Sequence, residues 1–182
     1  MNKKVILSLK VAYIVFLVGV TVLTTTLVCV NFTFTKVEIG LLFMAGAIPH
    51  LNEFIERRKH RLVRNIFLVL VVVGFLFGLG MVFDKKLTFD NVCLMFGLLD
   101  ICRGISEIVI NGVIYKKSPK SLVNFLNYGV SVGDIIFGVI LSIKGSHGLV
   151  GHLLYMSFAF LVMAGLEIYF IKKEHEESSH SH

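Results

Sequence analysis

The feature that most constrains this chain is a series of long, mostly apolar runs. Neither Val11–Val30 nor Asn65–Phe83 contains a charge. A transmembrane helix needs about 20 consecutive, mostly apolar residues, because the hydrocarbon core of a bilayer is about 30 Å thick. Runs of this length are not the alternating pattern of a soluble domain. The sequence therefore predicts an all-α integral membrane protein.

Six such runs are predicted to cross the membrane, so that residues 1–173 form a single transmembrane domain. Of the 182 residues, 55% are hydrophobic and 16% are charged, whereas soluble domains carry roughly a quarter charged residues. Pro49 interrupts the second run, but neighbouring helices in a membrane can accommodate the kink of a proline. The predicted spans are Val11–Val30, Val37–Ile55, Asn65–Phe83, Leu87–Tyr115, Ser121–Ile143 and Gly148–Ile171.

The first run is interpreted as a retained span and not as a cleaved signal peptide. Lys3 and Lys4 precede it, as they would in a signal peptide. However, the run is as long as the hydrocarbon core is thick, and it has no Ala-x-Ala cleavage site.

The basic residues of the short loops predict an orientation, because cytoplasmic loops are enriched in Lys and Arg. With six spans, 13 basic residues gather on the side that holds both termini and four on the opposite side. Both termini are therefore predicted to lie in the cytoplasm, with the chain in the cell membrane. The 13 are Lys3, Lys4, Lys10, Arg57, Arg58, Lys59, Arg61, Arg64, Lys116, Lys117, Lys120, Lys172 and Lys173, and the four are Lys36, Lys85, Lys86 and Lys144.

An internal repeat predicts three tandem helical hairpins, at approximately residues 5–60, 61–117 and 118–173. Glycines recur every 55 residues in the first helix of each pair, and a glutamate lies near the cytoplasmic end of each second helix. Three pairs in one orientation do not resemble the inverted repeats of many transporters. The repeated residues are Gly19, Gly74 and Gly129, and Glu53, Glu107 and Glu167.

Two Gly-x-x-x-Gly patterns lie at equivalent positions of the second and third hairpins. Gly74 and Gly78 form one, and Gly129 and Gly133 form the other. This spacing lines one helix face and lets helix backbones approach closely. Packing within one chain is the favoured interpretation, and a homo-oligomer interface is the alternative.

The polar segment that ends the chain, residues 174–182, is predicted to be a disordered cytoplasmic tail. Its histidines, His175, His180 and His182, lie near glutamates and offer weak metal binding as the less favoured alternative. No metal or other cofactor is expected elsewhere.

The chain resembles the HdeD family of bacterial membrane proteins. The stretch Leu94–Ile108, which carries Arg103-Gly104-Ile105-Ser106-Glu107, is similar to the apolar run followed by Arg-Gly-x-x-Glu in the middle hairpin of that family. The Asn-Pro that the family often has near the outer end of a first helix is missing here, and Pro49 is unusual for it. The resemblance implies a bacterial inner-membrane protein of stress response and acid resistance, and it implies no reaction.

Ionisable residues inside a membrane are costly and are therefore candidates for function. Two predicted helices carry such residues in narrow stripes, as a helical wheel shows. The candidate charge cluster, for proton relay or for packing, comprises Asp100, Arg103, Glu107 and Asp134, and the supporting polar residues are Asn111, Asn124, Asn127 and Ser131. His50 and His152 are each isolated in the sequence and are interpreted as packed or interfacial.

The spacing from the intervening turn predicts that Arg103 and Asp134 lie at the same depth and pair across the fourth and fifth helices. Asp100 and Glu107 would lie beside Arg103 on its own helix. Three carboxylates against one guanidinium leave two negative charges in excess. At least one carboxyl group is therefore expected to be protonated at neutral pH. A neutralised network that only fixes helix packing is the slightly favoured alternative to a proton relay or sensor.

The leading functional hypothesis is a non-enzymatic, HdeD-like protein that supports acid or envelope stress tolerance. The alternative is a small proton-linked transporter or channel that uses the buried carboxylates, and a third interpretation is an assembly partner of a larger complex. The chain has no Walker loop, His-Glu-x-x-His or Gly-x-Ser-x-Gly motif. The expected partners are the lipid bilayer and protons or a small solute; nucleic acid is not expected, since basic loops explain the net charge of +6.

Overall fold

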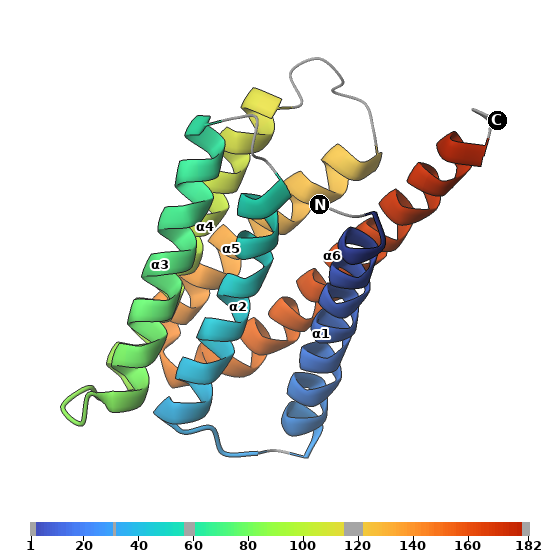
Figure 1. Cartoon of the computed structure of the whole chain (residues 1–182). Coiled ribbons are helices and arrows are strands. Elements are labelled where there is room, and N and C mark those ends of the chain that lie inside the picture. The colour runs from blue at the N-terminus through green and yellow to red at the C-terminus, as the bar shows by residue number, and fades with distance from the viewer. Residues whose placement is uncertain (1–2, 31, 57–60, 115–121, 180–182) are drawn as a thin grey trace. The chain divides into compact units, whose positions relative to one another are not determined.

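The computed structural model is all-α over the residues that it describes, which are 3–30, 32–56, 61–114 and 122–179 (Figure 1). A helix lies at each of the six predicted positions, so the predicted fold class is confirmed at this level. The helices are α1 (Lys3–Cys29), α2 (Lys36–Glu56), α3 (Arg61–Phe83), α4 (Phe89–Ile114), α5 (Leu122–Lys144) and α6 (Ser146–Ser179).

Four of these helices are long and apolar enough to cross a membrane: α1, α3, α5 and α6. The chain is accordingly a membrane protein. The helices α2 and α4 are of sufficient length, but they carry the charged residues and the proline that lower their mean hydropathy, including Pro49, Asp100 and Arg103. The apolar segments of the four are Leu7–Cys29, Arg61–Phe83, Leu122–Lys144 and Ser146–Lys173.

The chain divides into two units. Unit 1 comprises α1 and the part of α6 from Leu153 onward, and unit 2 comprises α2 to α5 with the first turns of α6, as far as His152. The proposed division into three sequential hairpins stays a prediction. The helix of α6 continues through Ser179, into the segment that the sequence predicted to be a disordered tail, and residues 180–182 lie outside the described part of the chain.

Unit 2 contains two antiparallel helix pairs, α2 with α3 and α4 with α5, each closed by two facing glycines. A Cβ atom on Gly40 would lie 2.8 Å from the Gly78 carbonyl oxygen, and one on Gly138 would lie 2.7 Å from the Gly97 carbonyl oxygen. Side chains are excluded at such distances, so the backbones touch directly. Gly74 and Gly78 thus serve packing within the chain, as the favoured interpretation predicted.

The glycines that suggested the repeat do not share an environment. Gly74 is packed against Ala47, whereas Gly19 and Gly129 have no atom within 4 Å of the place where a Cβ would stand. The two facing pairs, Gly40 with Gly78 and Gly97 with Gly138, match one another better than the glycines of the predicted repeat do.

Unit 1 has the same antiparallel arrangement between α1 and α6. The Thr21 hydroxyl donates to the Ser157 carbonyl oxygen at 3.3 Å, and Lys10 Nζ lies 3.6 Å from Glu167 Oε1. Glu167 is buried. The Glu167 carboxylate therefore turns toward α1.

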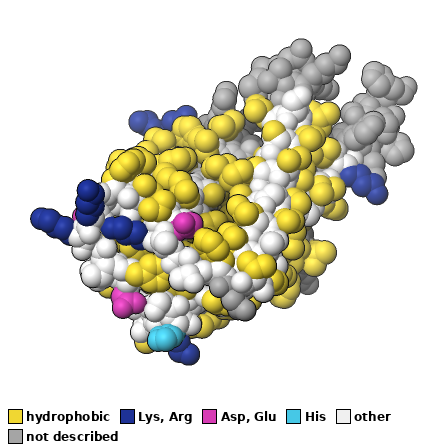
Figure 2. Space-filling view, turned by 90° about the horizontal axis from the view of Figure 1, so that it is seen from below, with side chains coloured by type: hydrophobic (Ala, Val, Ile, Leu, Met, Phe, Trp, Pro, Cys, Tyr) yellow, Lys and Arg dark blue, Asp and Glu magenta, His cyan; other side chains and the backbone are white. Residues whose placement is uncertain are grey.

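The helices of unit 2 are apolar on their outer faces and polar inside. On α4, Leu98 and Ile105 are about half exposed, at 50% and 51%, whereas Asp100 and Arg103 are only 3% and 9% exposed. Hydrophobic side chains also predominate among the described atoms in Figure 2, and few charged ones are visible. This is the reverse of a soluble helix, whose polar face meets water.

Candidate functional site

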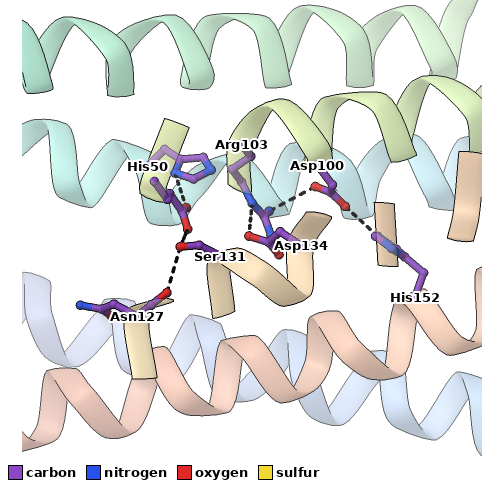
Figure 3. Close-up of polar contacts among 8 residues, drawn as sticks. His50, Asp100, Arg103, Asn127, Ser131, Asp134 and His152 are labelled. Carbon is purple, nitrogen blue, oxygen red and sulfur yellow. Dashed lines mark hydrogen bonds and ion pairs between the residues drawn. The ribbon is translucent and has the colours of Figure 1, made fainter. Parts of the chain in front are cut away.

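Seven side chains of unit 2 form a connected group that we call the polar cluster (Figure 3). They come from four helices, so segments that are far apart in the sequence meet at one place. The members are His50 on α2, Asp100, Arg103 and Glu107 on α4, Ser131 and Asp134 on α5, and His152 in the first turns of α6.

Arg103 and Asp134 make the closest contact of the polar cluster. Arg103 Nε donates to Asp134 Oδ2 at 3.0 Å, and Arg103 Nη2 donates to the other carboxylate oxygen. Asp134 is completely buried. Two parallel N–H···O contacts give this pair both strength and a fixed orientation. The pairing predicted across the fourth and fifth helices is confirmed.

Small residues make room for this pair. A Cβ on Gly104 would lie 2.5 Å from the Ser131 carbonyl oxygen and 3.2 Å from Asp134 Cβ. The α4 and α5 backbones therefore touch one residue after Arg103. On the α2 side, Gly46 faces the guanidinium, because its Cβ would stand 4.0 Å from Arg103 Nη1.

Asp100 links Arg103 to His152. Asp100 Oδ1 lies 3.5 Å from Arg103 Nη1, and Asp100 Oδ2 lies 2.8 Å from His152 Nε2. The His152 ring packs edge-on against Phe96 at a centroid distance of 4.7 Å, and Phe96 packs edge-on against Phe43 at 4.8 Å. Apolar rings thus cover this end of the polar cluster, and His152 is 1% exposed.

The turn between α5 and α6 brings His152 to α4. Gly145 has a φ of +54°, a left-handed conformation that glycine adopts without strain. The next backbone N–H, of Ser146, donates to Asp90 Oδ1 at 3.4 Å. Asp90 lies in the first turn of α4, so the same helix that carries Asp100 also holds the start of α6.

Glu107 forms the other end of the polar cluster. Glu107 Oε1 lies 3.8 Å from His50 Nδ1, and the Ser131 hydroxyl lies 3.1 Å from Glu107 Oε2. The same hydroxyl is 2.9 Å from the Asn127 carbonyl oxygen, and with one hydrogen it donates to one acceptor at a time. The His50 ring also stacks on Phe67 at a centroid distance of 6.0 Å.

The structure therefore brings together all four residues of the predicted charge cluster. Of the supporting residues, Ser131 contacts Glu107, and the carbonyl oxygen of Asn127 contacts Ser131. Asn111 and Asn124 are buried on α4 and α5.

His50 and His152 are packed against aromatic rings, as one of the two interpretations predicted, but each also lies beside a carboxylate, which was not predicted. Sequence reasoning missed them because it compared residues only along one helix and across one turn. The signal available was weak: each histidine directly follows a proline or a glycine in an apolar stretch, as in Ala47-Ile48-Pro49-His50 and Leu149-Val150-Gly151-His152.

The polar cluster carries more negative than positive fixed charge. Asp100, Glu107 and Asp134 face one guanidinium, and the excess is two negative charges when both histidines are neutral. Two protons would balance it, and the two histidines each lie beside a carboxylate that can share such a proton. The arrangement is therefore suited to binding protons.

The side chains of Glu53 and of the histidines in residues 174–182 lie outside the described part of the chain.

Metal-binding geometry is not found in residues 3–30, 32–56, 61–114 and 122–179: among them, no three His, Cys, Asp or Glu side chains gather in a way that could hold an ion. Comparisons with protein-family models, curated proteins and solved structures give no match for the chain.

Proposed function

We propose that this chain is a non-enzymatic, six-span protein of the bacterial inner membrane that takes up protons in the polar cluster and supports acid or envelope stress tolerance. The observation that carries the proposal is the composition of the polar cluster, with three carboxylates, one guanidinium and two histidines in mutual contact and covered from outside. Ionisable groups are expensive to bury in a membrane protein and are therefore candidates for function.

Six spans, and not four, best explain the exposed faces of α2 and α4. Leu41 on α2 is 53% exposed and Leu98 on α4 is 50% exposed, while Asp100 on α4 is covered. A helix that is apolar outside and charged inside pairs its charged side chains within the protein and exposes apolar side chains to lipid. With six spans, the bias of basic residues places both termini in the cytoplasm.

Acidification is the condition under which the polar cluster becomes electrically balanced. With both histidines neutral, the three carboxylates outweigh Arg103 by two charges. Since uncompensated charge in a low-dielectric interior is costly, two protons held in the polar cluster would stabilise the folded protein. The folded protein thereby responds to acid. The resemblance to the HdeD family, which rests on Arg103-Gly104-Ile105-Ser106-Glu107, supports placing this response in acid tolerance.

A proton-linked transporter or channel is the second candidate. The observation that favours it is the linear order of polar groups along α4, from His152 through Asp100 and Arg103 to Glu107 and His50 (Figure 3). Such a row would suit a path as well as a sensor.

The test is the survival in acid of bacteria whose chromosomal gene for the protein is deleted and which carry the gene, or a variant of it, on a plasmid. Asp100→Asn and Glu107→Gln each remove a carboxylate that can share a proton with a histidine. We expect both variants to reduce survival at low pH by about tenfold or more, the effect of removing about 1.4 kcal/mol from a proton-linked equilibrium. Asp84→Asn, which changes an exposed carboxylate outside the polar cluster, is the matched control and should survive like the unaltered chain.

Membrane levels of each variant must match, as measured by immunoblot. Equal survival of all variants at equal levels would contradict the acid-tolerance proposal.

A further inference from the structure

Arg103 occupies the middle of the row of exchangeable groups. On one side lie Asp100 and His152, and on the other lie Glu107 and His50 (Figure 3). Glu107 follows Arg103 by about one helical turn on α4. The two histidines, one on α2 and one on α6, end the row in opposite directions along α4.

The guanidinium is the one member of the row that cannot relay a proton. Arginine has five N–H donors and no acceptor, and it stays charged at any pH that a cell meets. Aspartate, glutamate and histidine can each accept a proton and release it again. A fixed positive charge in a narrow passage also excludes protons electrostatically.

The helices leave little room for a route around Arg103. At Gly104 the α4 backbone touches α5, since a Cβ there would lie 2.5 Å from the Ser131 carbonyl oxygen. Gly46 brings α2 against the guanidinium. Asp134 holds Arg103 in this position through two contacts. The titratable or charged side chains in contact with these groups are His50 from α2, Asp100 and Glu107 from α4, Asp134 from α5 and His152 from α6.

We infer that Arg103, fixed by Asp134, divides the polar cluster into two proton-binding sites and prevents protons from crossing between them. His152 with Asp100 forms one site, and His50 with Glu107 forms the other. The protein then binds protons from acid without dissipating the proton gradient of the membrane. This inference rests on the proposed function, because it assumes that the two sites take up protons.

The test uses the full chain in liposomes of phosphatidylethanolamine and phosphatidylglycerol, with a pH-sensitive dye inside and valinomycin with potassium to balance charge. The external pH is lowered, and the rate at which the liposome interior acidifies is measured. Liposomes with the unaltered chain should acidify inside no faster than protein-free liposomes. Arg103→Gln, which removes the charge but keeps a polar side chain, should acidify at least about tenfold faster, as a barrier lowered by about 1.4 kcal/mol would give.

Arg61→Gln is the matched control, because Arg61 is an exposed arginine at the start of α3, and it should behave like the unaltered chain. If Arg103→Gln does not yield helical, monodisperse protein, the double variant Arg103→Gln/Asp134→Asn takes its place. It removes both charges of the pair together and so leaves neither without its partner.

Rapid acidification by the unaltered chain would overturn the inference and would favour the transporter or channel. A folded Arg103 variant whose liposomes acidify no faster than those with Arg61→Gln would overturn the inference as well. Both results concern passage only. The proposed function fails separately, if the carboxylate variants survive acid normally.

Discussion

At the scale of the residue, the central feature is a charge pair inside a helix bundle that is coated with apolar side chains. Arg103 and Asp134 are joined by two parallel hydrogen bonds. Asp100 Oδ1 also lies 3.5 Å from Arg103 Nη1. Each partner makes the burial of the other tolerable. Removing one partner leaves an uncompensated buried charge, which costs far more than removing both.

This difference can be measured as the free energy of unfolding in mixed micelles with increasing dodecyl sulfate, followed by circular dichroism. Asp134→Ala should cost about 3 kcal/mol, at the lower end of the range for broken buried pairs because Asp100 still faces Arg103. Arg103→Gln/Asp134→Asn should cost about 1 kcal/mol. Asp84→Asn, at an exposed site, should stay within about 0.5 kcal/mol of the unaltered chain. A double variant as unstable as Asp134→Ala would show that the pair is not the source of the cost.

At the scale of the element, close glycine contacts decide which helices pair. Gly97 and Gly138 bring α4 against α5, and Gly40 and Gly78 bring α2 against α3. The sequence predicted six helices, and counting residues on either side of the turn between α4 and α5 predicted that Arg103 and Asp134 lie at the same membrane depth. It could not identify the facing glycines, because a glycine against a neighbouring backbone and a glycine toward open space look alike in a sequence. Gly138 and Gly129 on α5 are examples of the two cases.

Those two glycines give a matched experiment within one helix. Gly138→Ala should destabilise the protein by about 1–3 kcal/mol, because its Cβ would lie 2.7 Å from the Gly97 carbonyl oxygen and 3.1 Å from the Ile101 nitrogen. Gly129→Ala enters open space and should be neutral or stabilising by up to about 1 kcal/mol, since alanine favours a helix. The same dodecyl sulfate titration compares them. Equal effects at the two positions would contradict the close approach of α4 and α5.

At the scale of the whole molecule, the polar cluster gathers residues from helices that are distant in the chain. His50 and His152 belong to α2 and α6, yet both lie beside carboxylates of α4. Counting from one turn predicts contacts between the two helices that the turn joins and says nothing of helices farther away in the chain. For this reason the sequence predicted the Arg103–Asp134 pair and the negative excess but missed the two histidines. The two histidines matter for the charge of the polar cluster, because each adds a titratable side chain beside a carboxylate.

The account depends most on proton uptake by the polar cluster, and infrared difference spectroscopy of the purified chain between pH 8 and pH 4 measures it directly. As the pH falls, we expect bands of protonated carboxyl or imidazolium groups that diminish in Asp100→Asn and in Glu107→Gln, each variant losing a different part of the signal. Asp84→Asn, at an exposed site outside the polar cluster, is the control and should keep the bands that those two variants lose. If the spectra of Asp100→Asn and Glu107→Gln match that of the unaltered chain throughout this range, the polar cluster takes up no protons and serves only to pack the helices.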